Sequence, residues 1–417
     1  MAAFDRREFL QLGGLAAAAR LLSRQRTEPP IRTITRGPRH HWFGYYDKLQ
    51  FDPTDRYVLG NEVDFEHRTP TPEDTIRVGM VDRENDDAWI ELGESRAWCW
   101  QQGCMLQWRP GSPTEVLWND RVDGRFVCRI RDVATERTRL LSQPIYTISP
   151  DGSFALTTDF ARLQVMRPGY GYVGVDDPHA DELAPRDAGI VRVELDSDRA
   201  RTILSLGDIA AIPHEGRKLD DVWHYFNHLL VSPDGARFIA LHRWRSRDPE
   251  SGRPTGGFRT RMITASTDGG DVFVLNPSGV VSHFIWRDPE HVCMWTQPAG
   301  KPPGFYVYRD RTREIEPVGA GVMVRDGHVT YLPGATDWLL CDTYPDRERK
   351  QHPYLFRVGT GERFPLGAFR SPNEYRGEWR CDLHPRISND GRTVCIDSPH
   401  GGGGRQMHLI DVSGIER

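Results

Sequence analysis

The chain has 417 residues, a formal net charge of -5 and 10% aromatic residues. It is long enough to bury a large core, and its charge gives no overall basic field of the kind that attracts nucleic acid. It contains no run of about 18 apolar residues, so no membrane-spanning helix is expected.

The N-terminal segment has the pattern of an export signal. Arg6 and Arg7 form the pair of a twin-arginine motif, and the apolar stretch Leu10–Leu22 follows them. Such signals carry folded proteins through the Tat export machinery, so we expect a periplasmic or secreted protein. The alternative interpretation is a short amphipathic helix. We predict that residues 1–30 are a twin-arginine-type signal segment and exclude them from the fold.

From about residue 40 the sequence repeats one unit, whose clearest copy is Phe226–Leu241. The unit has a strand, a Ser-Pro-Asp-Gly turn and a second strand, because proline presets φ at the turn and glycine takes the positive φ of the return. The seven copies start at Lys48, Met105, Ile145, His228, His283, His328 and His384. A third apolar strand follows each hairpin, which is typical of propeller blades. The sequence therefore predicts an all-β fold over residues 38–417, a seven-bladed β-propeller of four-stranded antiparallel blades, with an insertion at residues 167–215.

The cysteines do not form a disulfide pattern. There are seven of them, an odd number, and none belongs to a CxxC pair. Several stand in apolar runs, where a free thiol acts as a small hydrophobic side chain. We expect buried free thiols.

Histidines recur at one position of the repeat. Aligned on the first strand, the last four copies each begin with histidine, namely His228, His283, His328 and His384. The first strand of a blade lines the central channel, so these four imidazoles should converge at one mouth of it. Neutral imidazole is the commonest metal ligand, and three or four would suit a divalent ion. The alternatives are a polar catalytic pocket, or structural histidines that donate to neighbouring blades.

Other polar residues are expected on the same face, in loops between the second and third strands or just before the first strand of a blade. These further candidates are His41, Tyr45, Gln102, His242, Arg243, Asp342, Arg386 and Arg405. Aromatic rings next to ionisable groups suit sugar stacking and proton transfer, or they pack as a lid on the core.

The Ser-Pro-Asp-Gly repeats, the unit His384–Gly391 and the histidine-rich mouth resemble the oligogalacturonate lyase family. The resemblance covers about residues 38–415 and includes the wider group of seven-bladed propeller polysaccharide lyases and rhamnosidases, among them ulvan lyases. In that family several histidines and a glutamine hold manganese at the channel mouth, so the resemblance implies a divalent metal, Mn, bound by His228, His283 and His384. His328 is an additional metal ligand candidate. The glutamine has no clear counterpart, and Asp382 stands two residues before His384.

The chemistry that this resemblance implies is β-elimination at a uronic acid of an acidic oligosaccharide. A cation neutralises the carboxylate and acidifies the C5 proton, a base removes that proton, and the C4 oxygen leaves. Arg243 is a candidate to stabilise the enolate, and His242, His41 and Tyr45 are candidate bases. The candidate substrate contacts are Arg386, Arg405, Gln102 and Asp342, the arginines because guanidinium binds carboxylate bidentately.

Two other functions are consistent with the sequence. A propeller glycoside hydrolase would need two carboxylates across the bond, for which the candidates are Asp47, Glu62, Asp120 and Asp342. A non-catalytic propeller would bind a glycan, another small molecule or a protein through one face, because the fold does not determine function.

Overall fold

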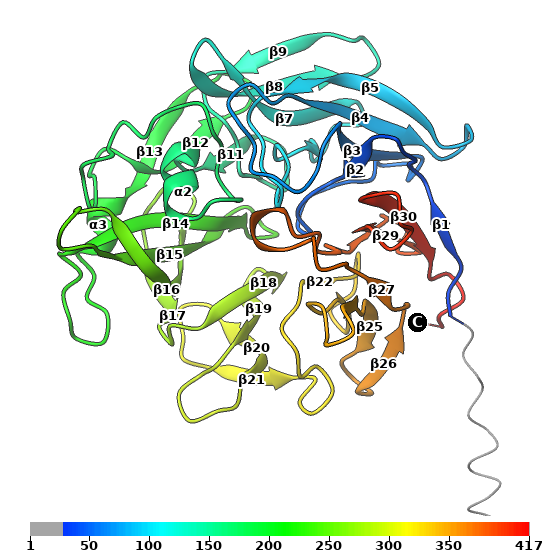
Figure 1. Cartoon of the computed structure of the whole chain (residues 1–417). Coiled ribbons are helices and arrows are strands. Elements are labelled where there is room, and N and C mark those ends of the chain that lie inside the picture. Colours follow the sequence, from blue (N-terminus) through cyan, green and yellow to red (C-terminus); the bar gives the residue numbers. More distant parts are fainter. Residues whose placement is uncertain (1–27, 417) are drawn as a thin grey trace, which may run out of the picture.

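The computed structural model describes residues 28–416, which form seven four-stranded antiparallel sheets and one two-stranded sheet. Figure 1 shows the four-stranded sheets arranged as a ring around a central axis. The predicted all-β propeller of four-stranded antiparallel blades is confirmed. Within the described residues, the number of four-stranded sheets equals the number of sequence copies.

The first four blades follow the chain, each sheet adding its strands in sequence order. Blade 1 comprises β2 (His40–Trp42), β3 (Tyr57–Val63), β4 (Ile76–Asp82) and β5 (Ala88–Ser95). Blade 2 comprises β6 (Gln107–Trp108), β7 (Glu115–Val122), β8 (Arg125–Asp132) and β9 (Thr138–Leu141). Blade 3 comprises β10 (Thr147–Ile148), β11 (Phe154–Thr157), β12 (Gly189–Glu194) and β13 (Ala200–Ser205). Blade 4 comprises β14 (Val222–Val231), β15 (Arg237–Arg247), β16 (Pro254–Ser266) and β17 (Phe273–Asn276).

The last three blades differ from this scheme at two points. Blade 5 comprises β18 (Val281–Asp288), β19 (His291–Thr296), β20 (Gly304–Arg309) and β21 (Ile315–Val318). Blade 6 comprises β22 (Val329–Tyr331), β23 (Trp338–Cys341), β25 (Tyr354–Arg357) and β26 (Glu362–Pro365), and beside it β24 (Lys350–Gln351) pairs with β27 (Phe369–Arg370). Blade 7 comprises β28 (Arg386–Ile387), β29 (Thr393–Ser398), β30 (Gln406–Asp411) and β1 (Ile31–Thr33).

The ring is closed by the two ends of the described chain. The N-terminal β1 pairs antiparallel with the C-terminal β30, with Ile31 opposite Ile410 and Thr33 opposite His408. Ile34, directly after β1, is buried in the core of blades 1 and 7. The propeller therefore begins before residue 38, the predicted boundary. Of the predicted signal segment, residues 1–27 lie outside the described residues.

The position at which the histidines align is a break in the innermost strand. Met105, His228 and His384 all have a left-handed φ, of 56°, 55° and 41°. In blade 4 the strand register shifts between Asn227 and Leu230, on either side of His228, and blade 5 has a similar shift around His283. An extra residue in a strand re-aims its side chain, so blades 4 and 5 carry a bulge at the position of the aligned histidine.

The predicted insertion at residues 167–215 is not one continuous segment, because β12 and β13 lie inside it as the outer strands of blade 3. Residues 158–188 form one excursion, which starts with α2 (Phe160–Met166), and a second contains α3 (Leu206–Ala210). Asp159 caps α2 by accepting from two backbone amides. The buried Arg162 donates to the carbonyls of Glu182, Leu183 and His224, and so fastens the first excursion to blade 4.

The apolar core lies between neighbouring sheets. All seven cysteines are buried and free, as predicted. In the part of the chain that the structure describes, no helix is long and apolar enough to cross a membrane.

Candidate functional site

Four histidines surround one tyrosine at the hub. The Tyr45 ring is stacked on His228, with ring centroids 5.1 Å apart, and lies 5.2 Å from His384 and 6.0 Å from His328. The His328 ring also contacts His283 at 4.2 Å and His384 at 4.3 Å. All four imidazoles are buried. The structure thus brings together the four residues that the repeat aligned.

Two of these histidines and an aspartate form a group that could hold a metal ion. One ligand atom from each of His328, Asp382 and His384 lies within 4.8 Å of the others. Nε2 of His384 is buried and has no hydrogen-bond partner among the described residues. Burial, followed by neighbouring cationic or imidazole groups, lowers the pKa of His328 and of His384 far below the usual range, so both are neutral and able to ligate.

Asp342 orients one of these ligands. Its Oδ2 lies 2.9 Å from Nδ1 of His328, and its Oδ1 accepts from the backbone N–H of the same residue at 2.7 Å. A proton on Nδ1 leaves the Nε2 lone pair for a ligand, as carboxylate–histidine pairs do around metals. Asp342 is therefore a positioning residue, and we do not assign it the substrate contact predicted from the sequence.

His283 and His228 lie outside the group of three. Nδ1 of His283 is 2.9 Å from Asp326, and its Nε2 is 3.4 Å from the hydroxyl of Tyr344. Nδ1 of His228 is 3.3 Å from the hydroxyl of Tyr146 and 3.5 Å from Nε2 of Gln102. Gln102 thus lies next to His228, and its role as a substrate contact stays a prediction.

Two arginines beside this cluster have no acidic partner among the described residues. Arg243 is 3% exposed, and its Nε and Nη1 are buried without a hydrogen-bond partner among the described residues. Its guanidinium lies 4.5 Å from the Phe258 ring, and that of Arg167 lies 4.6 Å from the same ring. Nη1 of Arg167 is also buried and unpartnered. Burial, and then the charge of Arg167, lowers the pKa of Arg243 to about 10, so it stays charged at neutral pH.

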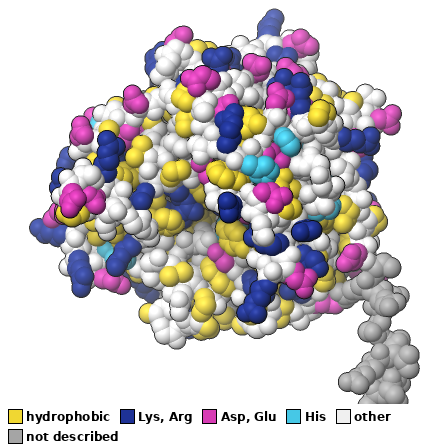
Figure 2. Space-filling view, in the orientation of Figure 1, with side chains coloured by type: hydrophobic (Ala, Val, Ile, Leu, Met, Phe, Trp, Pro, Cys, Tyr) yellow, Lys and Arg dark blue, Asp and Glu magenta, His cyan; other side chains and the backbone are white. Residues whose placement is uncertain are grey.

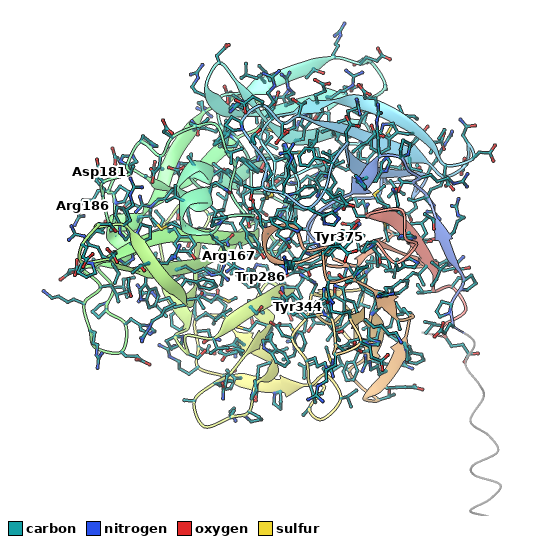
Figure 3. The ribbon with its side chains drawn as sticks, in the orientation of Figure 1. Arg167, Asp181, Arg186, Trp286, Tyr344 and Tyr375 are labelled. Atoms are coloured by element: carbon teal, nitrogen blue, oxygen red, sulfur yellow. The ribbon has the colours of Figure 1, made fainter. Side chains whose placement is uncertain are left out.

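Buried cations without partners are costly unless an anion joins them. Figure 2 shows that the face viewed along the axis is hollowed near its centre, with basic side chains beside the hollow. In the same orientation, Figure 3 places Arg167 and Tyr344 near the hub. The arrangement suits a carboxylate that enters from this face and takes up the free guanidinium donors.

The other two predicted arginines are occupied. Arg386 donates to Asp397 at 2.8 Å and to Gln50 at 2.9 Å, and it also binds the carbonyl of His384. Arg405 donates to Glu66 at 2.7 Å and to the carbonyl of Trp379 at 2.9 Å. Both guanidinium groups are almost fully buried in these pairs. Neither is free for a substrate carboxylate, so the structure corrects their predicted role to a structural one.

The candidate bases His242 and His41 are occupied as well. His242 is fully buried, with Nδ1 accepting from Arg261 at 3.0 Å and Nε2 lying 2.8 Å from His224. His41 lies 3.0 Å from Glu62 and 2.9 Å from Oε1 of Gln406. His242 was expected in a loop, but β15 continues through it and buries its ring. Both imidazoles have both nitrogens engaged and cannot take a substrate proton.

Comparisons with known proteins bear on the fold. No model of a protein family matches the sequence, and a comparison with curated proteins finds no match. A solved structure of an oligogalacturonate lyase in complex with manganese is similar with a TM-score of 0.66 and 14% identity, over 94% of this chain and 95% of that chain. An oligogalacturonate lyase from Vibrio parahaemolyticus is similar with a TM-score of 0.65 and 12% identity, over 94% and 96%.

The chain has the fold of the oligogalacturonate lyases. The β-propeller domain of the trilobed protease from Pyrococcus furiosus, described as an open velcro topology, is less similar, with a TM-score of 0.51 and 11% identity over 90% of this chain and 97% of that domain. The oligogalacturonate lyase fold agrees with the resemblance noted in the sequence. The identities are low enough that the comparison establishes the fold, while the function has to come from the site.

The site contains residues that the repeat could not reveal. Arg167 and Tyr170 lie in the excursion after α2, which has no counterpart in other copies, and Arg380 lies in the segment between β27 and β28. Figure 1 shows this last segment running from the rim across the face toward the hub. For Arg380, the local signal in the sequence was its place four residues before the aligned His384.

Proposed function

We propose that the protein is a lyase that cleaves uronic-acid-containing oligosaccharides by β-elimination. The observation that carries the proposal is that two groups lie at the same hub. One is the buried set His328, Asp382 and His384, which could hold a metal ion, and the other is the arginines Arg243 and Arg167, for which no acidic partner is found among the described residues. The same hub thus offers sites for a cation and for a carboxylate. The similarity of the whole fold to oligogalacturonate lyases supports the substrate class.

The arginines suit the first requirement of the reaction. The C5 proton of a uronate is acidic only when the charge that develops on the adjacent carboxylate is stabilised. The guanidinium groups of Arg243 and Arg167 lie 4.5 Å and 4.6 Å from the centroid of the same ring, Phe258, so a carboxylate that reaches both would receive donors from both. Their fixed charges would also stabilise the enolate without reorganisation during the reaction.

The ligand set suits a divalent cation, for which we propose Mn. His328, Asp382 and His384 would hold it, with His283 next to them, and three protein ligands leave open positions as catalytic sites do. The mixed imidazole and carboxylate donors and the unpartnered Nε2 of His384 support this assignment. When bound, such an ion supplies Lewis-acid stabilisation of oxygen atoms that gain negative charge.

A glycoside hydrolase is less well supported, because its candidate carboxylates are already engaged. Asp47 is paired with Lys48 at 3.0 Å, and Glu62 accepts from Arg39 at 2.7 Å. Asp120 accepts from Arg129 at 2.7 Å, and Asp342 holds His328. None of them is left as a free acid opposite a free base.

The test is incubation of the purified protein with oligogalacturonate, with and without added Mn²⁺, while the absorbance of the unsaturated uronate product is followed. We expect product, its loss with a chelator, and its loss in Arg243→Gln. Arg259→Gln is the matched control, because Arg259 is exposed on the neighbouring β16. Binding of the oligosaccharide without product would instead indicate a binding propeller, and new reducing ends that form without any unsaturated uronate would indicate a hydrolase.

The place of action is a separate proposal. The twin-arginine pattern leads us to propose export through the Tat machinery to the periplasm or beyond. Fractionation of cells that express the chain with Arg6→Lys and Arg7→Lys should show the protein retained inside, whereas the unchanged chain is exported.

A further inference from the structure

A cavity of about 270 Å³ lies at blade 6, beside the hub but outside it. Its walls come from the segment just before β22, from the loop between β23 and β25, and from β26. The side chains that line it include Val324, Arg325, Thr343, Tyr354 and Arg363. Small-molecule sites begin at about 300 Å³, so the volume suits one sugar residue rather than a whole chain.

The loop between β23 and β25 separates this cavity from the hub. On the hub side, Oδ2 of Asp342 lies 2.9 Å from Nδ1 of His328. On the same side, the hydroxyl of Tyr344 lies 3.4 Å from Nε2 of His283, and Figure 3 shows Tyr344 beside the hub. Thr343, between them in sequence, lines the cavity instead. Successive side chains of an extended chain point to opposite sides, so the wall here is one chain thick.

The segment before β22 shows the same alternation. Asp326 faces the hub, with Oδ1 2.9 Å from Nδ1 of His283, and Arg325 lines the cavity. Packed layers of extended chain are about 10 Å apart, so a group in the cavity and a group at the hub are separated by a similar distance. An oligosaccharide bound at the hub can therefore reach the cavity with a residue further along its chain.

The cavity contains two cations that lack an acidic partner. Within residues 28–416, neither Arg325 nor Arg363 forms an ion pair or a hydrogen bond, and the guanidinium of Arg363 lies 4.0 Å from the centroid of the Tyr354 ring. The one carboxylate in this lining, that of Asp346, is already 2.8 Å from Nε2 of His352. The cavity is therefore cationic, and its free guanidinium donors match a carboxylate.

The remaining lining suits the rest of a sugar ring. Val324 is 62% exposed at the edge of the cavity, where it offers an apolar contact to C–H groups. The hydroxyl of Thr343 accepts from the backbone N–H of His352 at 3.2 Å, so its own proton is left for a ligand oxygen. Unpaired cations, an apolar edge and a hydroxyl donor together match a sugar acid better than a neutral sugar.

We propose that this cavity is a second carboxylate site, which binds another uronate residue of the oligosaccharide that is cleaved at the hub. The proposal rests on the lyase function proposed above. The two residues that flank the cleaved bond occupy the hub, so the next residue along the chain is the first that reaches the cavity. Arg325 and Arg363 bind its carboxylate, and Val324 packs against its ring. The site therefore favours trigalacturonate over digalacturonate.

The experiment measures KM and kcat on trigalacturonate and on digalacturonate, with Mn²⁺, for the unchanged protein and for Arg325→Gln and Arg363→Gln. Each change should raise KM for trigalacturonate about fivefold, the upper end for an exposed ion pair. It should leave kcat unchanged, because the lost contact is the same in the ground state and the transition state. On digalacturonate neither constant should change.

Arg357→Gln is the matched control. Arg357 also lies over an aromatic ring, with its guanidinium 5.4 Å from the centroid of Trp338. It is at the opposite end of the same sheet, since Arg357 pairs with Trp338 while Tyr354 pairs with Cys341. Arg357→Gln should keep both constants on both substrates.

The outcomes separate this site from the function on which it rests. An unchanged KM for trigalacturonate in Arg325→Gln and Arg363→Gln, or an equal rise on digalacturonate, overturns the second site and leaves the lyase proposal standing. Absence of elimination product from the unchanged protein overturns the lyase proposal. Calorimetric titration of the metal-free protein with trigalacturonate then tests the cavity alone: weaker binding by Arg363→Gln than by Arg357→Gln supports a carboxylate site, and equal binding overturns it.

Discussion

Asp342→Asn is the sharpest test of the metal site, because it alters a residue that orients a ligand without being one. The aspartate accepts from Nδ1 of His328 at 2.9 Å and from the backbone N–H of His328 at 2.7 Å. Asparagine keeps the shape, but its amide group puts a donor in place of the oxygen that lies 2.9 Å from Nδ1 of His328, which leaves that nitrogen only the longer contact of 3.0 Å with the other oxygen. The His328 ring then loses its fixed tautomer and orientation. Removal of such an outer carboxylate lowers metal affinity about 10- to 100-fold, or about 1.4–2.7 kcal/mol.

Calorimetric titration of the metal-free protein with Mn²⁺ measures this change directly. Asp346→Asn is the matched control, because Asp346 lies 2.8 Å from Nε2 of His352 in a similar carboxylate–histidine pair away from the hub. The control should bind Mn²⁺ as the unchanged protein does. Equal affinity in Asp342→Asn, or an equal loss in Asp346→Asn, would refute the reasoning.

Three further predictions concern substrate binding by Arg243, stability at low pH and the closure of the ring by β1. Arg243→Met should abolish binding of oligogalacturonate yet leave the thermal unfolding midpoint unchanged or higher, because it removes a buried charge without a partner; a lower midpoint in a thermal scan would contradict this. Burial lowers the pKa of His224 and of His408 to about 4 from 6.5, so below pH 6.5 the unfolded chain binds protons that the folded chain does not. Urea midpoints should therefore fall between pH 6.5 and 4, and His408→Asn should reduce the fall; a flat profile would count against it. Deletion of residues 1–34 removes β1 and the buried Ile34, so it should lower the urea midpoint, whereas deletion of residues 1–27 should not.

The repeat was sufficient to predict both the ring and the meeting point of the histidines. A blade positions its innermost strand by the same turn chemistry each time, and Met105, His228 and His384 show that a left-handed φ recurs in three of the copies. An alignment of copies therefore carries three-dimensional information. The prediction that four imidazoles share one place depended on nothing else.

The partners of charged residues could not be predicted in this way. The sequence offered Arg386, Arg405 and Arg243 alike as carboxylate ligands, yet Arg386 pairs with Asp397 on the next strand and Arg405 pairs with Glu66 from another blade. Whether an arginine is free depends on these long-range pairings. His242 was misplaced for a local reason, since the end of a strand is weakly marked in sequence and β15 extends beyond it.

Tyr170 shows a different limit. It lies in an excursion that occurs once, so no second copy indicates where it points. Its environment is made by Arg380 and Arg167, from two separate segments that cross the same face. Only the folded arrangement reveals that a lone tyrosine has two cationic neighbours.

The strand β1 joins the sheet whose inner end carries Asp382 and His384, so the seam of the ring and the proposed ion site belong to one blade. An ion that binds only when this blade is complete must, by thermodynamic linkage, hold the two chain ends together. Binding of the ion at the hub would then stabilise the pairing of β1 with β30, and disruption of that pairing would lower the affinity for the ion. Mn²⁺ should accordingly protect β1 and β30 from proteases, although its proposed site lies at the far edge of the same sheet.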